Sequence, residues 1–174
     1  MKTLYLLRHA KSSWKQDVLD DFDRPLNKRG RADAVAMGRF LAEGAMLPSQ
    51  VLCSSARRTR ETLERLQGML ATPLPARFEK GVYLADAPSL LRRVKRLNDS
   101  LASVMLVGHN PGLERLALLL AADGDGTLHR ELSAKFPTGC LAVLEAAVER
   151  WADLKPACAR ITVFVRARDL ALTE

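Results

Sequence analysis

Short apolar runs alternate with longer amphipathic segments along this 174-residue chain, and this alternation limits the folds that it can adopt. The short runs predict strands at residues 3–7, 50–53, 104–107, 141–145 and 161–165. The amphipathic segments predict helices at about residues 28–44, 56–70, 89–97 and 111–121. Strands and helices in this order favour an α/β fold, a three-layer α/β/α sandwich built on a mostly parallel sheet. No helical pattern separates the last two strands, so an antiparallel edge would make the sheet mixed.

The last of these helices has a clear start in the sequence. Asn110 is a favoured N-cap residue, and Pro111 suits the first helical position because the N–H that it lacks would have no partner there. Gly44 in turn suits the end of the first helix.

Length and cysteine content bear on the number of domains and the cell compartment. A chain of 174 residues most simply forms one domain, 1–174, with a core large enough to need no disulfide and no structural metal. The three cysteines are odd in number and have no paired spacing, which is typical of reduced thiols in a cytoplasmic protein. No apolar run is long enough for a signal region or a membrane span. We therefore expect a cytoplasmic protein that does not bind a membrane.

The net charge of +7 favours anionic partners through long-range attraction. Nucleic acid is disfavoured, because only 5% of the residues are aromatic, which is too few for a base-stacking surface. The densest basic stretch, residues 92–96, lies on a predicted helix and should point to solvent, away from the apolar face of that helix. No apolar stripe marks a dimer face, so the sequence leaves the oligomeric state open.

Basic and imidazole side chains follow three of the predicted strands at the point where each strand ends. Arg8 and His9 end the first strand, and His109 ends the third. The second strand runs into Arg57 and Arg58. Because the carboxyl ends of parallel strands lie at one edge of a sheet, we expect these groups, with either Arg58 or Arg57, to converge there.

Such a cluster suits the transfer of a phosphoryl group. Guanidinium groups bind phosphoryl oxygens in a bidentate manner, and a helix N-terminus adds free N–H donors. Burial and neighbouring positive charge would lower the pKa of His9, keep it neutral at pH 7 and leave it nucleophilic. His109 could stabilise the charge of the transition state by donating to a phosphoryl oxygen. Lys11, Ser12 and Asn110 lie beside the two histidines in the sequence and are candidate substrate-binding residues.

Three ordered blocks of the sequence resemble motifs of one enzyme family. Residues 7–12 (LRHAKS) resemble the R-H-G motif of the histidine phosphatase, or phosphoglycerate mutase-like, superfamily. Residues 54–62 (SSARRTRET) resemble its S-x-x-x-R-A-x-x-T block, and residues 107–112 (VGHNPG) resemble its third block in the G-H-N-P form. Residues 23–30 and 136–139 also match turns of these proteins. The resemblance covers most of the chain, and the sequence looks most similar to the small SixA-type phosphohistidine phosphatases.

The resemblance implies a role for each central residue. His9 would be the nucleophile, Arg8 and Arg58 the phosphate ligands, and His109 the electrostatic partner, with no metal and no cofactor. In that register Arg58, and not Arg57, binds the phosphate.

The sequence departs from the family pattern in ways that bear on the substrate. Ala10 replaces the usual Gly, and Lys15 stands where mutases and esterases of the family have Asn. The mutases also place a proton-donating carboxylate between the second and third blocks. Here that interval is short, and its nearest acids, Glu79 and Asp86, lie in no motif that aligns.

The missing acid favours a substrate with a good leaving group. A phosphomonoester releases an alkoxide that needs a proton from a general acid, whereas a phosphohistidine releases an imidazole, which leaves more readily. The sequence therefore predicts a metal-independent phosphatase that removes phosphate from a histidine of a phosphotransfer or carrier protein in signal transduction, through a phosphohistidine enzyme intermediate. The positive charge would help to recruit an acidic partner surface. Two alternatives stay open: a small-molecule phosphomonoesterase of the same superfamily, and a non-catalytic phosphate- or protein-binding module.

Two other phosphatase patterns fit less well. Residues 123–127 (DGDGT) match the D-x-D-G-T string of aspartate-nucleophile phosphatases, which must end a strand; here they follow a predicted helix, so we expect a polar loop. Cys53 lies one residue closer to Arg58 than cysteine phosphatases require, so we expect a buried strand residue.

Overall fold

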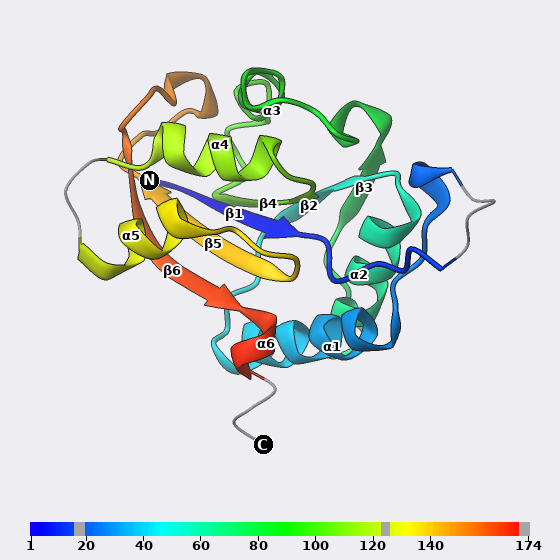
Figure 1. Ribbon diagram of the computed structural model, residues 1–174. Helices are drawn as coiled ribbons and strands as arrows, with labels where there is room; N and C mark the ends of the chain where they lie inside the picture. Colours follow the sequence, from blue (N-terminus) through cyan, green and yellow to red (C-terminus); the bar gives the residue numbers. More distant parts are fainter. Residues whose placement is uncertain (16–19, 123–125, 171–174) are drawn as a thin grey trace.

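The computed structural model describes residues 1–15, 20–122 and 126–170 and shows a six-stranded sheet with helices on both faces (Figure 1). The strands are β1 (Lys2–Arg8), β2 (Gln50–Ser54), β3 (Ala76–Glu79), β4 (Ser103–Gly108), β5 (Cys140–Ala146) and β6 (Ala159–Arg166). Across the sheet their order is β3-β2-β4-β1-β5-β6. β5 runs antiparallel to both of its neighbours, and the other pairings are parallel. The predicted α/β sandwich with a mixed, mostly parallel sheet is therefore confirmed.

Helices cover the two faces in two groups. The helices are α1 (Lys28–Glu43), α2 (Arg57–Gln67), α3 (Ala87–Val94), α4 (Gly112–Leu120), α5 (Gly126–Ala134) and α6 (Ala167–Leu170), with short 3-10 helices η1 (Asp21–Asp23), η2 (Lys80–Val82) and η3 (Trp151–Asp153). Side chains of α1, α2 and α6 share one apolar core with the sheet, and those of α3, α4 and α5 share the other. Figure 1 shows α1 and α6 below the sheet and α3 and α4 above it.

The alternation of side chains along each strand produces these two cores. In β1, Leu4 and Leu6 pack into the core under α3 and α4, whereas Tyr5 and Leu7 pack against α1 and α2. β4 lies between β1 and β2, and its side chains enter both cores: Val104 and Leu106 lie in one, Met105 and Val107 in the other. This position explains why residues 104–107 are apolar without a break.

The start of α4 differs from the sequence prediction. Asn110 is not the N-cap residue: Pro111 holds that position, after a cis peptide bond, and the helix begins at Gly112. The Asn110 side chain instead donates from Nδ2 to Glu114 Oε2 and to the Phe136 carbonyl oxygen, each at 2.9 Å. One contact within the first turn of α4 and one with a distant residue thus replace the single cap bond that local preference predicts.

Three elements were not predicted. β3 is a four-residue edge strand whose side chains are mostly exposed, so it lacks the apolar run of a buried strand. α6 has only four residues. α5 begins at Gly126, so the expected loop over residues 123–127 is wrong for its last two positions, and residues 123–125 lie outside the described part of the chain. Cys53 is fully buried in β2, as predicted.

Candidate active site

The register of the sheet places the two motif histidines side by side. β1 pairs with β4 so that Arg8 lies beside Gly108, and each strand continues directly into its histidine. The His9 backbone N–H donates to the Gly108 carbonyl oxygen at 3.0 Å. The centroids of the His9 and His109 rings are 5.3 Å apart, with the rings tilted at 54°. The predicted convergence at the carboxyl edge of the sheet is therefore present for these two residues.

The hydrogen bond of His9 fixes which ring nitrogen is free. Nδ1 lies 2.7 Å from the Ala10 carbonyl oxygen, and a carbonyl can only accept, so Nδ1 carries the hydrogen. The lone pair of neutral His9 is then on Nε2. The pKa of His9 is lowered to about 3. Burial is the main cause, and the charges of Arg58 and Arg8 contribute to the same shift. The His9 ring is therefore uncharged at neutral pH.

His109 is neutral as well, with its tautomer set by its neighbours. Arg58 Nη2 lies 3.2 Å from His109 Nδ1, and a guanidinium can only donate, so Nδ1 accepts. Nε2 then carries the hydrogen and donates to Ser54 Oγ at 2.8 Å. Burial first, and then the charge of Arg58, lower the pKa of His109 to about 3. The ring of Tyr83 packs edge-on against His109, with the centroids 5.3 Å apart.

Arg58 is held in the site by three groups from distant parts of the chain. Its side chain is 2% exposed. Besides its contact with His109, it donates from Nη1 to the Asp21 carbonyl oxygen at 2.6 Å and from Nη2 to Asp21 Oδ2 at 3.0 Å. Thr62 Oγ1 donates to the Arg58 carbonyl oxygen at 2.6 Å and accepts from the Ala10 N–H at 3.0 Å, which ties α2 to the loop that follows His9.

Arg57, the other candidate, does not lie in the site. Its side chain is exposed and pairs with Glu61 on the same helix, with Nε 2.7 Å from Oε1. Of the two arginines, the structure therefore places only Arg58 beside the histidines.

Arg8 and Asn110 meet at one carbonyl group. The Phe136 carbonyl oxygen accepts from Arg8 Nη1 at 3.0 Å and from Asn110 Nδ2 at 2.9 Å. Of the described residues, four have a buried side-chain polar atom without a hydrogen-bond partner, and three of these atoms are Arg8 Nε, Arg58 Nε and Asn110 Oδ1. A buried N–H group without a partner is costly. The two guanidinium N–H groups are donors that a bound anion would satisfy.

Asp21 is a functional candidate that the sequence reasoning missed. Its carboxylate accepts from Tyr83 Oη at 2.6 Å, from Arg24 Nε at 3.0 Å and from Arg58 Nη2 at 3.0 Å. Although partial burial raises the pKa of Asp21, these hydrogen bonds and the charge of Arg58 outweigh it and lower the pKa to about 2. The carboxylate is thus ionised at neutral pH. No motif contains Asp21, and Asp20 and Asp23 lie close to it in the sequence, so nothing in the sequence distinguishes this acid from the other two.

The predicted substrate-binding residues Lys11 and Ser12 lie on the loop after His9, but their hydrogen bonds are with residues outside the histidine pair. Lys11 is exposed, and its carbonyl oxygen accepts from the Asn27 N–H at 3.0 Å. Ser12 is buried, and its Oγ accepts from Arg24 Nη1 at 2.6 Å. A contact of either residue with substrate stays a prediction.

The two acids between the second and third blocks are engaged elsewhere. Glu79 forms a bidentate ion pair with Arg93, in which Arg93 Nη2 donates to Oε1 at 2.6 Å and Nε donates to Oε2 at 2.8 Å. Asp86 is the N-cap of α3 and accepts from the Ser89 N–H at 2.8 Å. Neither carboxyl group contacts the histidines in the structure.

Two glycines let the loops of the site approach the starts of helices. A Cβ on Gly30, in the first turn of α1, would lie 2.0 Å from the Lys11 carbonyl oxygen. A Cβ on Gly112, the first residue of α4, would lie 2.0 Å from the Ala85 carbonyl oxygen. Any side chain at either position would displace the loop, so direct backbone contact holds the loop after His9 and the loop before α3.

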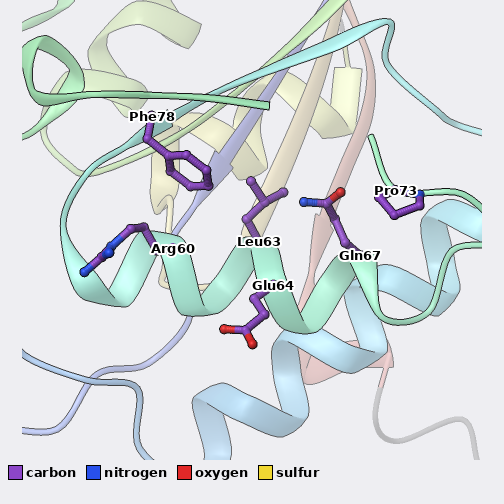
Figure 2. A pocket seen from close by; sticks show the side chains of 6 residues that line it. All are labelled: Arg60, Leu63, Glu64, Gln67, Pro73 and Phe78. Carbon is purple, nitrogen blue, oxygen red and sulfur yellow. The ribbon is translucent and has the colours of Figure 1, made fainter. Parts of the chain in front are cut away.

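A separate hollow of about 380 Å³ lies between α2 and β3 (Figure 2). In Figure 2, Leu63 and Gln67 rise from α2, and the Phe78 ring lies beside Leu63, on the side away from Gln67. Gln67 carries the fourth buried atom without a partner, Oε1. None of the predicted catalytic residues lines this hollow.

The part of the chain that the structure describes contains neither a metal-binding cluster nor a helix that could span a membrane. Within residues 1–15, 20–122 and 126–170, no group of three or more His, Cys, Asp or Glu side chains is placed to hold a metal ion. Over the same residues no helix has the length and apolar character needed to cross a bilayer.

The lowered histidine pKa values predict how stability depends on pH. Below about pH 6.5 the unfolded chain takes up protons on these histidines and the folded chain does not, so unfolding becomes easier as the pH falls toward 3. Replacing His9 by Asn should flatten the slope of unfolding free energy against pH by about 1 kcal/mol per pH unit in this window. Denaturant titrations of both proteins in phosphate-free buffer measure that slope. Above about pH 7.5 their difference should be constant, and an equal slope for both proteins at acid pH would contradict the prediction.

Comparisons with known proteins cover nearly the whole chain. A family model described as the histidine phosphatase superfamily (branch 1) matches residues 4–81. An uncharacterised protein of Mycobacterium tuberculosis is 36% identical over 160 residues, which are 91% of this chain and 98% of that protein. A structure from Nakamurella multipartitia, assigned as the phosphohistidine phosphatase SixA, is 29% identical with a TM-score of 0.82 and 95% of each chain covered. Another with the same assignment, from Agrobacterium tumefaciens, is 32% identical with a TM-score of 0.78, and 94% of this chain and 97% of that chain are covered.

Proposed function

The chain belongs to the histidine phosphatase superfamily, and we propose that it is a phosphatase that removes phosphate from a phosphohistidine carried by another protein. The observation that carries the proposal is the neutral His9 beside Arg8 and Arg58, each of which has a buried Nε–H without a hydrogen-bond partner. The two SixA-assigned structures support the same substrate class. Both ends of the described chain contribute strands to one sheet, which supports our further proposal that residues 1–174 form one domain.

In the proposed reaction His9 is the nucleophile. Its Nε2 lone pair attacks phosphorus as the bond between phosphorus and the substrate imidazole breaks, and that ring, protonated on its other nitrogen, keeps the electron pair and leaves as neutral imidazole. Arg8 and Arg58 bind the phosphoryl oxygens. A water molecule then attacks the phosphohistidine of the enzyme, the bond between phosphorus and His9 breaks, and phosphate leaves while the water proton passes to solvent. These steps draw on no metal and no cofactor.

His109 would act as the electrostatic partner. In the empty site its Nδ1 accepts from Arg58. The negative charge of an arriving phosphoryl group favours the charged imidazolium, so the pKa of His109 rises when substrate binds. Protonated at both nitrogens, His109 could donate to a phosphoryl oxygen from Nδ1 and keep its bond to Ser54 from Nε2.

The acids of the site support an imidazole as the leaving group. Asp21, the carboxylate that contacts Arg58, is ionised and already accepts from three side chains, so it is a poor proton donor at pH 7. Glu79 and Asp86 are bound elsewhere. A site of this kind serves a leaving group that departs without a general acid.

We place the activity in the cytoplasm, which the free thiols of Cys53, Cys140 and Cys158 support.

A comparison of leaving groups tests the proposal. The purified protein, treated with a chelator, is given a phosphohistidine protein, an aryl phosphate and an alkyl phosphate. We expect kcat/KM for the alkyl phosphate to be at least about a thousandfold lower than for the phosphohistidine protein, because a general acid contributes about 10² to 10⁴ to such reactions and the carboxyl groups discussed above, from the described residues, are not placed to serve as one. Faster turnover of the alkyl phosphate would instead identify a small-molecule phosphomonoesterase. Phosphate binding without turnover of any substrate would identify a non-catalytic module.

A further inference from the structure

One large aromatic side chain near the site is mostly exposed to solvent. Trp14 follows His9 on the same loop, and it is 74% exposed. The guanidinium of Arg24 lies against its ring, with Cζ 3.5 Å from the ring centroid. An exposed tryptophan stacked on an arginine is typical of the residues that dominate protein–protein binding.

Arg24 holds this tryptophan on a rigid support. Arg24 is only 8% exposed. It donates from Nε to Asp21 Oδ1 at 3.0 Å and from Nη1 to Ser12 Oγ at 2.6 Å. An arginine fixed in this way loses little further freedom when a partner binds, so binding costs less.

The same contacts connect Trp14 to the phosphate site. The second carboxylate oxygen of Asp21 accepts from Arg58 and from Tyr83, and the Tyr83 ring packs against His109. Trp14 therefore lies outside the phosphate site and is joined to it through Arg24 and Asp21. A substrate must extend beyond its phosphorylated side chain to reach it.

We propose that Trp14, stacked on Arg24, is a docking platform for the protein that carries the phosphohistidine. This inference rests on the proposed function. The occupant is a folded protein surface with an apolar side chain beside the phosphorylated histidine, which covers the free face of the indole. Lys11 and Lys15 are exposed on the same loop and the chain carries a net charge of +7, so acidic residues around that side chain complete the match.

The test compares one variant on two substrates of different size. Trp14→Ala is assayed with a phosphohistidine protein and with phosphoimidazole, which presents the same reacting bond without a protein surface. For the protein substrate we expect KM to rise by about ten- to thirtyfold with kcat unchanged, as for loss of a binding hot spot. For phosphoimidazole we expect kcat/KM within about twofold of the wild type. Leu47→Ala is the matched control, since Leu47 is 50% exposed but precedes β2 at the opposite edge of the sheet.

Two results would overturn the platform while the proposed function stands. An unchanged KM for the protein substrate would show that Trp14 does not contact it. An equal loss on both substrates would show that Trp14 acts through Arg24 and Asp21 on the phosphate site. If the wild type cleaves neither substrate, the proposed function itself fails, and the platform fails with it.

Discussion

The His9→Ala protein loses its turnover of phosphohistidine by at least about four orders of magnitude, because removal of a nucleophile eliminates the covalent step. The substitution takes away the Nε2 lone pair and leaves both arginines in place. Binding of an anion such as vanadate should therefore persist. Single-turnover assays with a radiolabelled phosphohistidine protein measure the loss and show whether the enzyme becomes labelled.

The chain contains its own control for this experiment. It has three histidines, and His129 is on α5, where its Nδ1 lies 3.5 Å from Ser133 Oγ of the same helix. His129→Ala should keep both full turnover and the label on the enzyme. A labelled phosphoenzyme in the His9→Ala protein, or a label that maps to His109 in the wild type, would contradict the assignment of the nucleophile.

The Arg58→Ala protein should lose about a hundred- to a thousandfold in kcat/KM, the usual cost of removing a buried donor to transition-state charge. Arg58 donates to both Asp21 and His109, so its loss removes a phosphate ligand and also frees His109 Nδ1. Arg58→Lys should recover little of the activity, because an ammonium group lacks the planar fork of the guanidinium. Steady-state kinetics on the phosphohistidine protein measure these losses, and thermal unfolding checks that the variants are folded.

Arg57 is the matched control, because it is the same residue type one position earlier on the same helix. It is exposed and paired only with a carboxylate on its own helix, so Arg57→Ala should stay within about threefold of the wild type. A larger loss for Arg57→Ala than for Arg58→Ala would reverse the assignment of the phosphate ligand.

The placement of His9 and His109 was predictable because it follows from topology. Each ends a parallel strand, and parallel strands end at one edge, so the two residues had to lie near one another once the strands were recognised. The same reasoning left Arg57 and Arg58 open, because both lie where β2 leads into α2. Only the burial of Arg58 and the pairing of Arg57 within its helix distinguish them.

The role of Asp21 was not predictable, because it depends on contacts between distant residues. Asp21 ends no strand, and it meets Arg58 across 37 positions and Tyr83 across 62 positions of sequence. For Asn110 the sequence made a prediction from local preference, an N-cap, that the structure shows to be wrong. Its local preference for an N-cap is worth about 1 kcal/mol, and contacts with Glu114 and the distant Phe136 carbonyl outweigh it.

The close approaches at Gly30 and Gly112 have a consequence for how the substrate range of this enzyme can change. There the loops of the site rest on helix backbone with no side chain between them, so exchange of core residues cannot move them apart. Changes of substrate range through evolution or engineering then fall mainly on exposed side chains outside the phosphate site, such as Trp14. The selectivity for partner proteins can therefore change at these exposed positions while the residues that bind the phosphoryl group stay the same.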